Sequence, residues 1–359
     1  MGGTGAMGSS LVPLLAQDKN NEIIVTSRRK IDDDQNIHYL RGNAKDLYFI
    51  NGLLQDKIYD VIVDFMLYSV EEFNDRISLL LKATKHYLFF SSSRVYAETK
   101  DLITESSPRL LDATNDQDYI EDFEYSLYKA AEEDILIKST FKNWTIIRPY
   151  KTYSDDRLQL AVFEKEDWAL RPLRGKKVVF LRDSMCKYTS LTYTGDVARI
   201  LRSIIYSDKA FGKTYQIANP EQVTWNDVIK IYQKAYEKHG FNFQVEITND
   251  YHSLSIVFNN KYRIKYDGLV NRKFSDESIQ RDFGPFKWTK VDDGLSYCTN
   301  NYIGNCIKQK QRINYSIEGY FDRITKEKEP IHKIPGLKNK TKYFLFRYLP
   351  YQLIMNNKK

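Results

Sequence analysis

The chain has 359 residues, 42% of them hydrophobic and 28% charged, which is typical of a soluble globular protein long enough for two lobes. No apolar run approaches the roughly 18 residues of a membrane-spanning helix, and the N-terminus shows no secretory signal. Three cysteines without a C-x-x-C pair and five scattered histidines argue against a disulfide framework and against a zinc site. We therefore expect a cytoplasmic protein that holds no metal.

The formal net charge of +7 belongs to one segment of the chain. Residues 331–359 contain no acid and seven cations, which are Lys333, Lys338, Lys340, Lys342, Arg347, Lys358 and Lys359. Subtracting these seven charges from +7 leaves residues 1–330 formally neutral. The body of the protein is therefore not a general polyanion binder, and we expect no nucleic-acid partner.

The first 150 residues alternate short apolar runs with helical patterns. Strands are predicted at 22–25, 59–65, 86–90 and 144–148, and helices at 9–17, 46–55, 70–83 and 123–139. The strand runs are rich in Ile, Val, Phe and Tyr and nearly continuous, as expected for parallel strands buried on both faces. The alternation predicts an α/β fold with a doubly wound parallel sheet.

The pattern loosens after Pro149 into a smaller mixed lobe. Strands are predicted at 178–181, 213–219 and 243–248, and helices at 194–207, 224–240, 275–284 and 291–303. We expect a dinucleotide-binding domain over 1–150 and a mixed α/β substrate lobe over 151–310, some elements of which return to the first domain. Residues 311–359 form a basic, aromatic tail without a clear period.

The chain opens on a glycine loop, MGGTGAMGSSL. Gly2, Gly5 and Gly8 have the spacing of a Rossmann-type loop, in which a tight turn, a close backbone approach and tight helix packing hold a pyrophosphate at a helix N-terminus. Ala6 and Met7 complete the predicted cofactor-binding loop. Such a loop normally follows a buried strand, but only Met1 precedes it. We expect the first strand to be truncated and the natural chain to start some residues upstream.

The residues after the next two strands bear on which dinucleotide binds. An NAD site carries an acid at the end of its second strand, where it binds the ribose 2′-hydroxyl. This chain has Ser27 and Arg28 after the 22–25 strand instead, and a hydroxyl and a guanidinium suit a 2′-phosphate. A solvated surface turn is the alternative. Asn43 could contact the adenine edge. The pattern favours NADP over NAD as the cofactor.

Ser92 follows the carboxyl end of the predicted 86–90 strand. Tyr125 and Lys129 are four residues apart and therefore lie on one face of a predicted helix. A lysine cation stabilises a phenolate, which can then take a proton from a substrate hydroxyl while a hydride leaves the same carbon. A serine hydroxyl steadies the developing oxyanion. With 27 tyrosines in the chain, a Y-x-x-x-K match can arise by chance, but the order of loop, strands, serine and tyrosine helix favours a catalytic site.

With these residues in order, residues 1–305 resemble the extended short-chain dehydrogenases/reductases of the nucleotide-sugar epimerase/dehydratase family. The resemblance implies Tyr125 as base, Lys129 as its electrostatic partner and Ser92 as the catalytic hydroxyl, with Ser93 as the fallback. It also implies a homodimer through the tyrosine-bearing helices. Ser93, Arg94 and Lys151 are the expected substrate-binding residues: the first two stand where dehydratases of the family carry acids, and Lys151 stands where an asparagine often touches substrate.

We therefore expect an NAD(P)-dependent epimerase acting on a nucleotide-sugar by hydride abstraction and return. An NADPH-dependent carbonyl reductase of the same fold is one alternative. A non-catalytic dinucleotide-sensing or RNA-binding protein is another, which an intact Ser92, Tyr125 and Lys129 argues against. For the basic tail, packing on its own domain is favoured over a weak contact with a membrane surface, because Pro350 interrupts any long helix.

Overall fold

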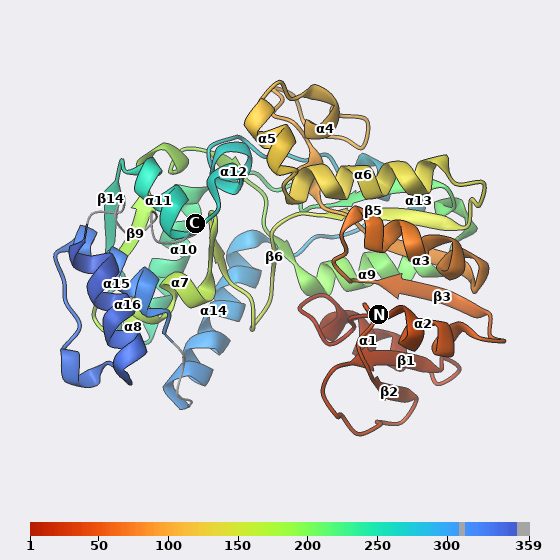
Figure 1. Cartoon of the computed structure of the whole chain (residues 1–359), viewed down its shortest axis with the longest axis horizontal. Helices are drawn as coiled ribbons and strands as arrows, with labels where there is room; N and C mark the ends of the chain where they lie inside the picture. Colours follow the sequence, from red (N-terminus) through yellow and green to blue (C-terminus); the bar gives the residue numbers. More distant parts are fainter. Residues whose placement is uncertain (309–312, 350–359) are drawn as a thin grey trace. The chain divides into compact units, whose positions relative to one another are not determined.

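The computed structural model describes residues 1–308 and 313–349. The chain divides into two compact units (Figure 1). Unit 1 contains Met1–Ser154, Ser190–Glu221 and Lys273–Thr289, and unit 2 contains Asp155–Thr189, Gln222–Arg272 and Lys290–Lys359. The chain thus leaves unit 1 and returns to it twice, and each unit is described separately.

Unit 1 is built on a parallel sheet, which confirms the predicted α/β class. Four strands lie in the order β12-β5-β4-β3, and β1 and β2 form a separate parallel pair. The strands are β1 (Ile23–Ser27), β2 (Ile37–Arg41), β3 (Tyr59–Asp64), β4 (Thr84–Phe90), β5 (Trp144–Pro149) and β12 (Lys213–Ile217), with β6 (Thr152–Tyr153) paired to β11 (Thr192–Tyr193).

Helices cover both faces of this sheet, as Figure 1 shows. Tyr87 and Phe89 of β4 pack with residues of α2 and α3, whereas Leu88 and Phe90 pack with residues of α1 and α9. The alternation of side chains along a strand explains why β4 reads as one continuous apolar run. The helices of unit 1 are α1 (Gly8–Ala16), α2 (Leu47–Leu54), α3 (Val70–Lys82), α4 (Leu110–Ala113), α5 (Gln117–Asp122), α6 (Tyr125–Lys138), α9 (Thr194–Ile205) and α13 (Glu277–Phe283).

A cavity of about 770 Å³ lies between the two parts of the sheet of unit 1. Strands β1 and β3 both line it, yet β1 pairs only with β2 and β3 only with β4 among the described residues. Met1 lines this cavity. The Met1 ammonium donates to the Val63 carbonyl at 2.6 Å, and the Met1 carbonyl accepts from the Phe65 N–H at 3.1 Å. Burial lowers the pKa of this ammonium. The cavity therefore separates β1 from β3 next to Met1.

Unit 2 is a mixed α/β unit of short strands and many helices. Its strands are β7 (Gln159–Leu160), β8 (Phe163–Glu164), β9 (Val178–Leu181), β10 (Tyr188–Thr189), β13 (Val223–Thr224) and β14 (Val245–Thr248). Its helices are α7 (Lys165–Trp168), α8 (Leu170–Leu173), α10 (Trp225–Lys238), α11 (Tyr251–Val257), α12 (Lys261–Arg263), α14 (Val291–Lys308), α15 (Tyr315–Thr325) and α16 (Leu337–Tyr348). Strands β9 and β14 pair in parallel, with β9 fully buried.

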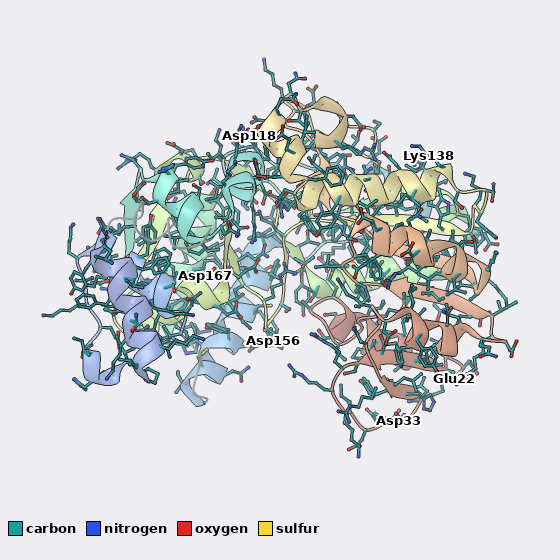
Figure 2. The ribbon with its side chains drawn as sticks, in the orientation of Figure 1. Glu22, Asp33, Asp118, Lys138, Asp156 and Asp167 are labelled. Carbon is teal, nitrogen blue, oxygen red and sulfur yellow. The ribbon has the colours of Figure 1, made fainter. Side chains whose placement is uncertain are left out.

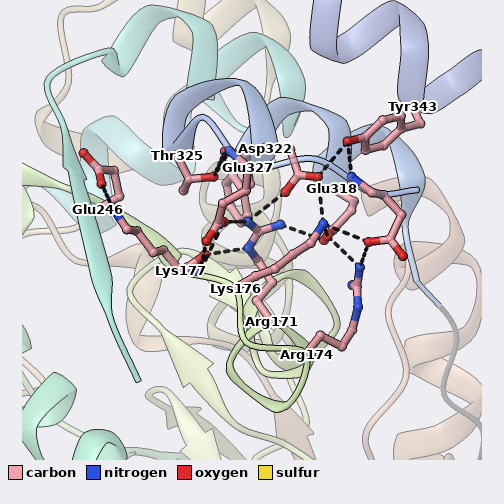
Figure 3. A network of polar contacts seen from close by, with 12 residues as sticks. Arg171, Arg174, Lys176, Lys177, Glu246, Glu318, Asp322, Thr325, Glu327 and Tyr343 are labelled. Carbon is pink, nitrogen blue, oxygen red and sulfur yellow. Dashed lines mark hydrogen bonds and ion pairs between the residues drawn. The ribbon is translucent and has the colours of Figure 1, made fainter. Parts of the chain in front are cut away.

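The C-terminal helices α15 and α16 pack on each other and on unit 2, so the described part of the tail is folded. Gly319 allows the close approach, because a Cβ there would lie 2.4 Å from the Tyr343 carbonyl oxygen. A buried ionic network fastens α15 to the segment that precedes β9 (Figure 3). Its members include Arg171, Arg174, Lys176, Glu318, Asp322, Glu327 and Glu329. Residues 311–312 and 350–359 of the predicted tail lie outside the described residues.

Candidate functional site

The glycine loop lies against the carboxyl ends of β1 and β3. Gly2 has a φ of 71°, a left-handed conformation that favours glycine, and its N–H donates to the Thr26 hydroxyl at 3.2 Å. A Cβ at Gly8 would lie 2.4 Å from the Gly3 carbonyl oxygen, so only glycine fits there. Among the described residues, the N–H groups of Ala6, Met7 and Gly8 have no hydrogen-bond partner. Free N–H groups at the start of α1 fit a bound phosphate.

The residues predicted to select the dinucleotide differ in exposure. Ser27 is buried, and its hydroxyl accepts from the Arg29 N–H at 3.1 Å. Arg28 is exposed and makes no ion pair within the described ranges. Asn43 is also exposed, and its side-chain oxygen accepts from the Lys45 N–H at 3.2 Å. Arg28 is therefore available to an anionic ligand, whereas Ser27 and Asn43 already brace their own turns.

The three serines after β4 have different surroundings. The Ser92 hydroxyl accepts from the Arg94 N–H at 3.2 Å and keeps its own proton available. The Ser93 hydroxyl is buried and donates to the Arg148 carbonyl at 2.8 Å, so it fastens β4 to β5. The Ser91 hydroxyl is buried without a hydrogen-bond partner among the described residues. This arrangement favours Ser92 over Ser93 as the hydroxyl that meets a substrate.

Tyr125 is the first residue of α6, which runs to Lys138 at its far end (Figure 2). The helix begins there because the Glu124 carboxylate accepts from the Ser126 N–H at 3.1 Å. Arg94 pairs with Glu124 at 2.7 Å, and its guanidinium carbon lies 4.9 Å from the centre of the Tyr125 ring. Within the described residues the Tyr125 hydroxyl has no hydrogen-bond partner. Arg94, predicted as a substrate contact, is therefore a cation that lies over this ring.

Lys129 lies on α6 but its ammonium is engaged. It is fully buried, 2.8 Å from the Glu132 carboxylate and 4.6 Å from the centre of the Phe89 ring. Among the described residues, Glu132 is the acid that forms an ion pair with this ammonium. Burial raises the pKa of Glu132 to about 7, although Lys129 opposes the shift. The expected partnership of Lys129 with Tyr125 therefore competes with an ion pair.

A second buried acid lies near this ion pair, and the sequence does not predict it. Asp64 ends β3, and its carboxylate accepts from the Tyr87 hydroxyl at 2.8 Å and from the Tyr68 hydroxyl at 3.1 Å. Burial raises the pKa of Asp64, while the charges of the Met1 ammonium and Lys129 oppose the shift. The sequence does not single out either acid. Glu132 resembles a charge on the solvated face of a helix, and Asp64 resembles an ordinary polar residue at the end of a strand. The i,i+3 spacing of Lys129 and Glu132 is the signal that could have found the ion pair.

Lys151 follows β5 in a turn with a φ of 30°, unusual for a residue with a side chain. It is buried, and its ammonium lies 5.2 Å from the centre of the Tyr150 ring. Upstream, Arg148 makes two short bonds to Glu133 of α6, at 2.8 and 2.6 Å. This bidentate pair ties β5 to α6 and so fixes the helix that carries Tyr125.

No protein-family model matches the chain. The curated chloroplast stem-loop binding protein of 41 kDa b from Arabidopsis thaliana is 23% identical over 250 residues, which are 66% of this chain and 62% of that protein. The chain thus spans less than two thirds of the length of this relative. At this identity and coverage, the relative does not establish a family for the chain.

Unit 1 has a Rossmann-type fold, and unit 2 is a second, mixed unit. More particularly, the chain has the fold of the NAD-dependent nucleotide-sugar epimerases and dehydratases, which confirms the predicted resemblance in fold. MoeE5, solved with UDP-glucuronic acid and NAD, is 17% identical with a TM-score of 0.65, covering 85% of this chain and 98% of that one. The dTDP-glucose 4,6-dehydratase of Bacillus anthracis, solved with NAD, is 18% identical with a TM-score of 0.65 over 85% and 96%. The UDP-glucuronic acid 4-epimerase of Bacillus cereus is 15% identical with a TM-score of 0.64 over 85% and 98%.

Proposed function

We propose that the protein is an NAD(P)-dependent epimerase, or a related oxidoreductase, that acts on a nucleotide-sugar. The proposal rests on three features of unit 1. These are the unpaired N–H groups at the start of α1, the Ser92 hydroxyl in the turn after β4, and the unbonded Tyr125 hydroxyl on α6, which packs against that turn. Solved proteins of the same fold contain NAD and UDP-sugars, which supports this substrate class.

Each residue has a definite chemical task in this proposal. The N–H groups of Ala6, Met7 and Gly8 bind the pyrophosphate of the dinucleotide. The dinucleotide supplies an acceptor for hydride. The Tyr125 phenol exchanges a proton with the substrate hydroxyl, the Ser92 hydroxyl donates to the substrate oxygen, and a cation beside the phenol favours its ionised form. Burial raises the pKa of the neighbouring Tyr128, so that tyrosine is the poorer base of the two.

The finer assignments follow from the residues around this site. We propose NADP rather than NAD, because the exposed Arg28 can meet a 2′-phosphate. Epimerisation or net reduction is favoured over dehydration, because Ser93 and Arg94 offer no acid to expel water. Lys151 and Arg94 are proposed as substrate contacts. A homodimer through α6 and a cytoplasmic location complete the proposal, the latter because all three thiols are free.

Ligand analysis and one pair of variants test the proposal. Mass spectrometry of the purified full chain should show a bound dinucleotide, and incubation with UDP-glucuronic acid or UDP-glucose should give the epimer without bulk consumption of NADPH. Tyr125→Phe should lower turnover by about 10²–10⁴-fold and keep the dinucleotide bound. Tyr128→Phe, one turn along the same helix, is the matched control and should stay active.

The rival candidates give different outcomes. Bulk consumption of NADPH with a carbonyl substrate would establish the reductase. The ion pair between Lys129 and Glu132 favours a non-catalytic dinucleotide-sensing or RNA-binding protein, because it occupies the ammonium that the mechanism needs. Activity that is unchanged in Tyr125→Phe would decide for that binding function.

A further inference from the structure

Helix α16 presents two different faces. Tyr343 is buried against α15, whereas Leu337, Phe344 and Tyr348 are 80%, 54% and 55% exposed. With about 100° per residue, these three side chains and the exposed Thr341 fall within one narrow stripe along the helix. The stripe points away from the buried side of the helix. Large apolar groups are thus lined up where the described part of unit 2 does not cover them.

Cations border this apolar stripe on both sides. Lys338 and Lys342 lie on one flank at helical spacing, and Lys340 lies on the other, whereas Nε and Nη1 of Arg347 are buried. None of the three lysines is in an ion pair with a residue that the structure describes, and residues 331–349 contain no acid. Long cationic side chains can keep their charge in water while their stems lie along apolar surface.

The stripe is held rigidly by the contacts behind it. The Tyr343 hydroxyl donates to Asp322 at 2.7 Å and accepts from the Glu329 N–H at 2.7 Å. Asp322 belongs to the ionic network that fastens α15 to Arg171 and Lys176. The exposed face is therefore a fixed surface and not the outside of a loose tail.

We propose that α16 is a membrane-surface helix that lies on an anionic bilayer through Leu337, Phe344 and Tyr348. An apolar stripe flanked by Lys338 and Lys342 on one side and by Lys340 on the other matches the interface of such a bilayer, where apolar groups enter the acyl boundary and cations meet lipid phosphates. An RNA partner would use the cations but has no use for Leu337, which has no ring on which a base could stack. No described helix is long and apolar enough to cross a membrane, so α16 lies on the surface. The proposal is independent of the proposed enzymatic activity.

Flotation with lipid vesicles tests the proposal on the full chain. The protein should float with vesicles of phosphatidylcholine and phosphatidylserine, stay behind with phosphatidylcholine alone, and dissociate as salt rises. Leu337→Gln with Phe344→Gln should weaken binding by about tenfold or more, since each buried apolar side chain contributes substantially. Lys338→Gln with Lys342→Gln should weaken it to a similar extent and reduce the salt dependence. Unchanged thermal unfolding of both variants would show that they fold.

Two matched variants act as controls in unit 1. Tyr48→Gln with Ile58→Gln removes two exposed apolar side chains, and Lys30→Gln with Lys57→Gln removes two exposed cations. Both should bind anionic vesicles like the unaltered protein. Equal binding of the Leu337→Gln, Phe344→Gln variant would overturn the proposal. Binding to a stem-loop RNA that needs Lys338 and Lys342 but not Leu337, without flotation, would overturn it in favour of a nucleic-acid surface.

Discussion

Glu132 in unit 1 and Glu318 in unit 2 are both buried helix carboxylates that meet lysine, yet their pKa values move in opposite directions. Burial raises the pKa of Glu132 to about 7, because Lys129 alone opposes it. Burial would also raise the pKa of Glu318, but Arg171, Arg174 and Lys176 together overcome it and lower the pKa to about 2. The number of cations around a buried acid decides which state the fold stabilises.

The difference extends to the two regions as a whole. The acids of the unit 2 network each accept bonds from more than one partner, as Asp322 does from Arg171, Lys176 and Tyr343. In unit 1 Glu132 meets Lys129 alone, and Met1 buries an ammonium beside a cavity. Several cations around one acid stabilise its ionised form, whereas a single ion pair does not offset the cost of burying the acid.

The largest expected effect comes from filling the cavity of unit 1. An apolar pentapeptide added before Met1 would reach along β3, replace a buried ammonium by an amide and pair with both strand edges. Five aliphatic side chains at roughly 1.5–3 kcal/mol each set an upper limit of about 15 kcal/mol. The midpoint of thermal unfolding, measured by calorimetry, should rise by on the order of 10 °C or more.

A pentapeptide of glycine and serine is the control for this extension. It removes the buried ammonium in the same way but brings no apolar side chains. It should therefore gain much less than the apolar peptide. An apolar extension that leaves the melting midpoint unchanged would show that the cavity does not accept a strand.

Glu318→Gln should show the next largest effect, with the opposite sign. Removing the charge leaves Arg171, Arg174 and Lys176 underpaired, which costs about 3–5 kcal/mol of unfolding free energy near neutral pH. Because the folded pKa lies below the ordinary value near 4.5, this stabilisation is present above pH 4.5 and is lost as the pH falls toward 2. Urea unfolding across that range should show the two proteins converging in acid, and the exposed Glu237→Gln should behave like the unaltered protein.

Glu132→Gln should stabilise the protein above neutral pH. The folded pKa of Glu132 is raised, so its contribution is present below pH 4.5 and is lost as the pH rises through about 7. A rise from 4.5 to about 7 corresponds to about 3 kcal/mol. Gln resembles the protonated acid, so the variant should equal the unaltered protein near pH 5 and exceed it at pH 8. The reverse order in urea unfolding would mean that the ion pair with Lys129 is stabilising, and Glu121→Gln is the exposed control.

These ion pairs also show which parts of the fold could be predicted from the sequence and which could not. Strands such as β4 could be predicted because burial on both faces makes a continuous apolar run. Helices α15 and α16 were not predicted. The α15 acids Glu318 and Asp322 have helical spacing, but they resemble charges on a solvated helix face. Their partners near Arg171 lie about 150 positions away, and local periodicity carries no trace of them.

The candidate site shows the same limit. The identities of Ser92, Tyr125 and Lys129 are readable because a strand end and a helix face set their spacing. The partners are not: Arg94 lies against the Tyr125 ring and Glu132 holds Lys129. Which of several nearby charges pairs with a given side chain depends on tertiary packing, which the spacing of one helix does not fix.

Tyr343→Phe should have the smallest effect and tests whether the unit 2 network is redundant. The hydroxyl serves Asp322 and the Glu329 N–H, but Asp322 keeps Arg171 and Lys176 as partners. Only the Glu329 N–H is left without its bond, so the loss should be about 1–2 kcal/mol, well below that of Glu318→Gln. The exposed Tyr348→Phe should cost nothing measurable in the same urea titration. A loss as large as that of Glu318→Gln would mean that the network acts as one cooperative unit, because a single neutral hydrogen bond would then be as important as a charge held by three cations.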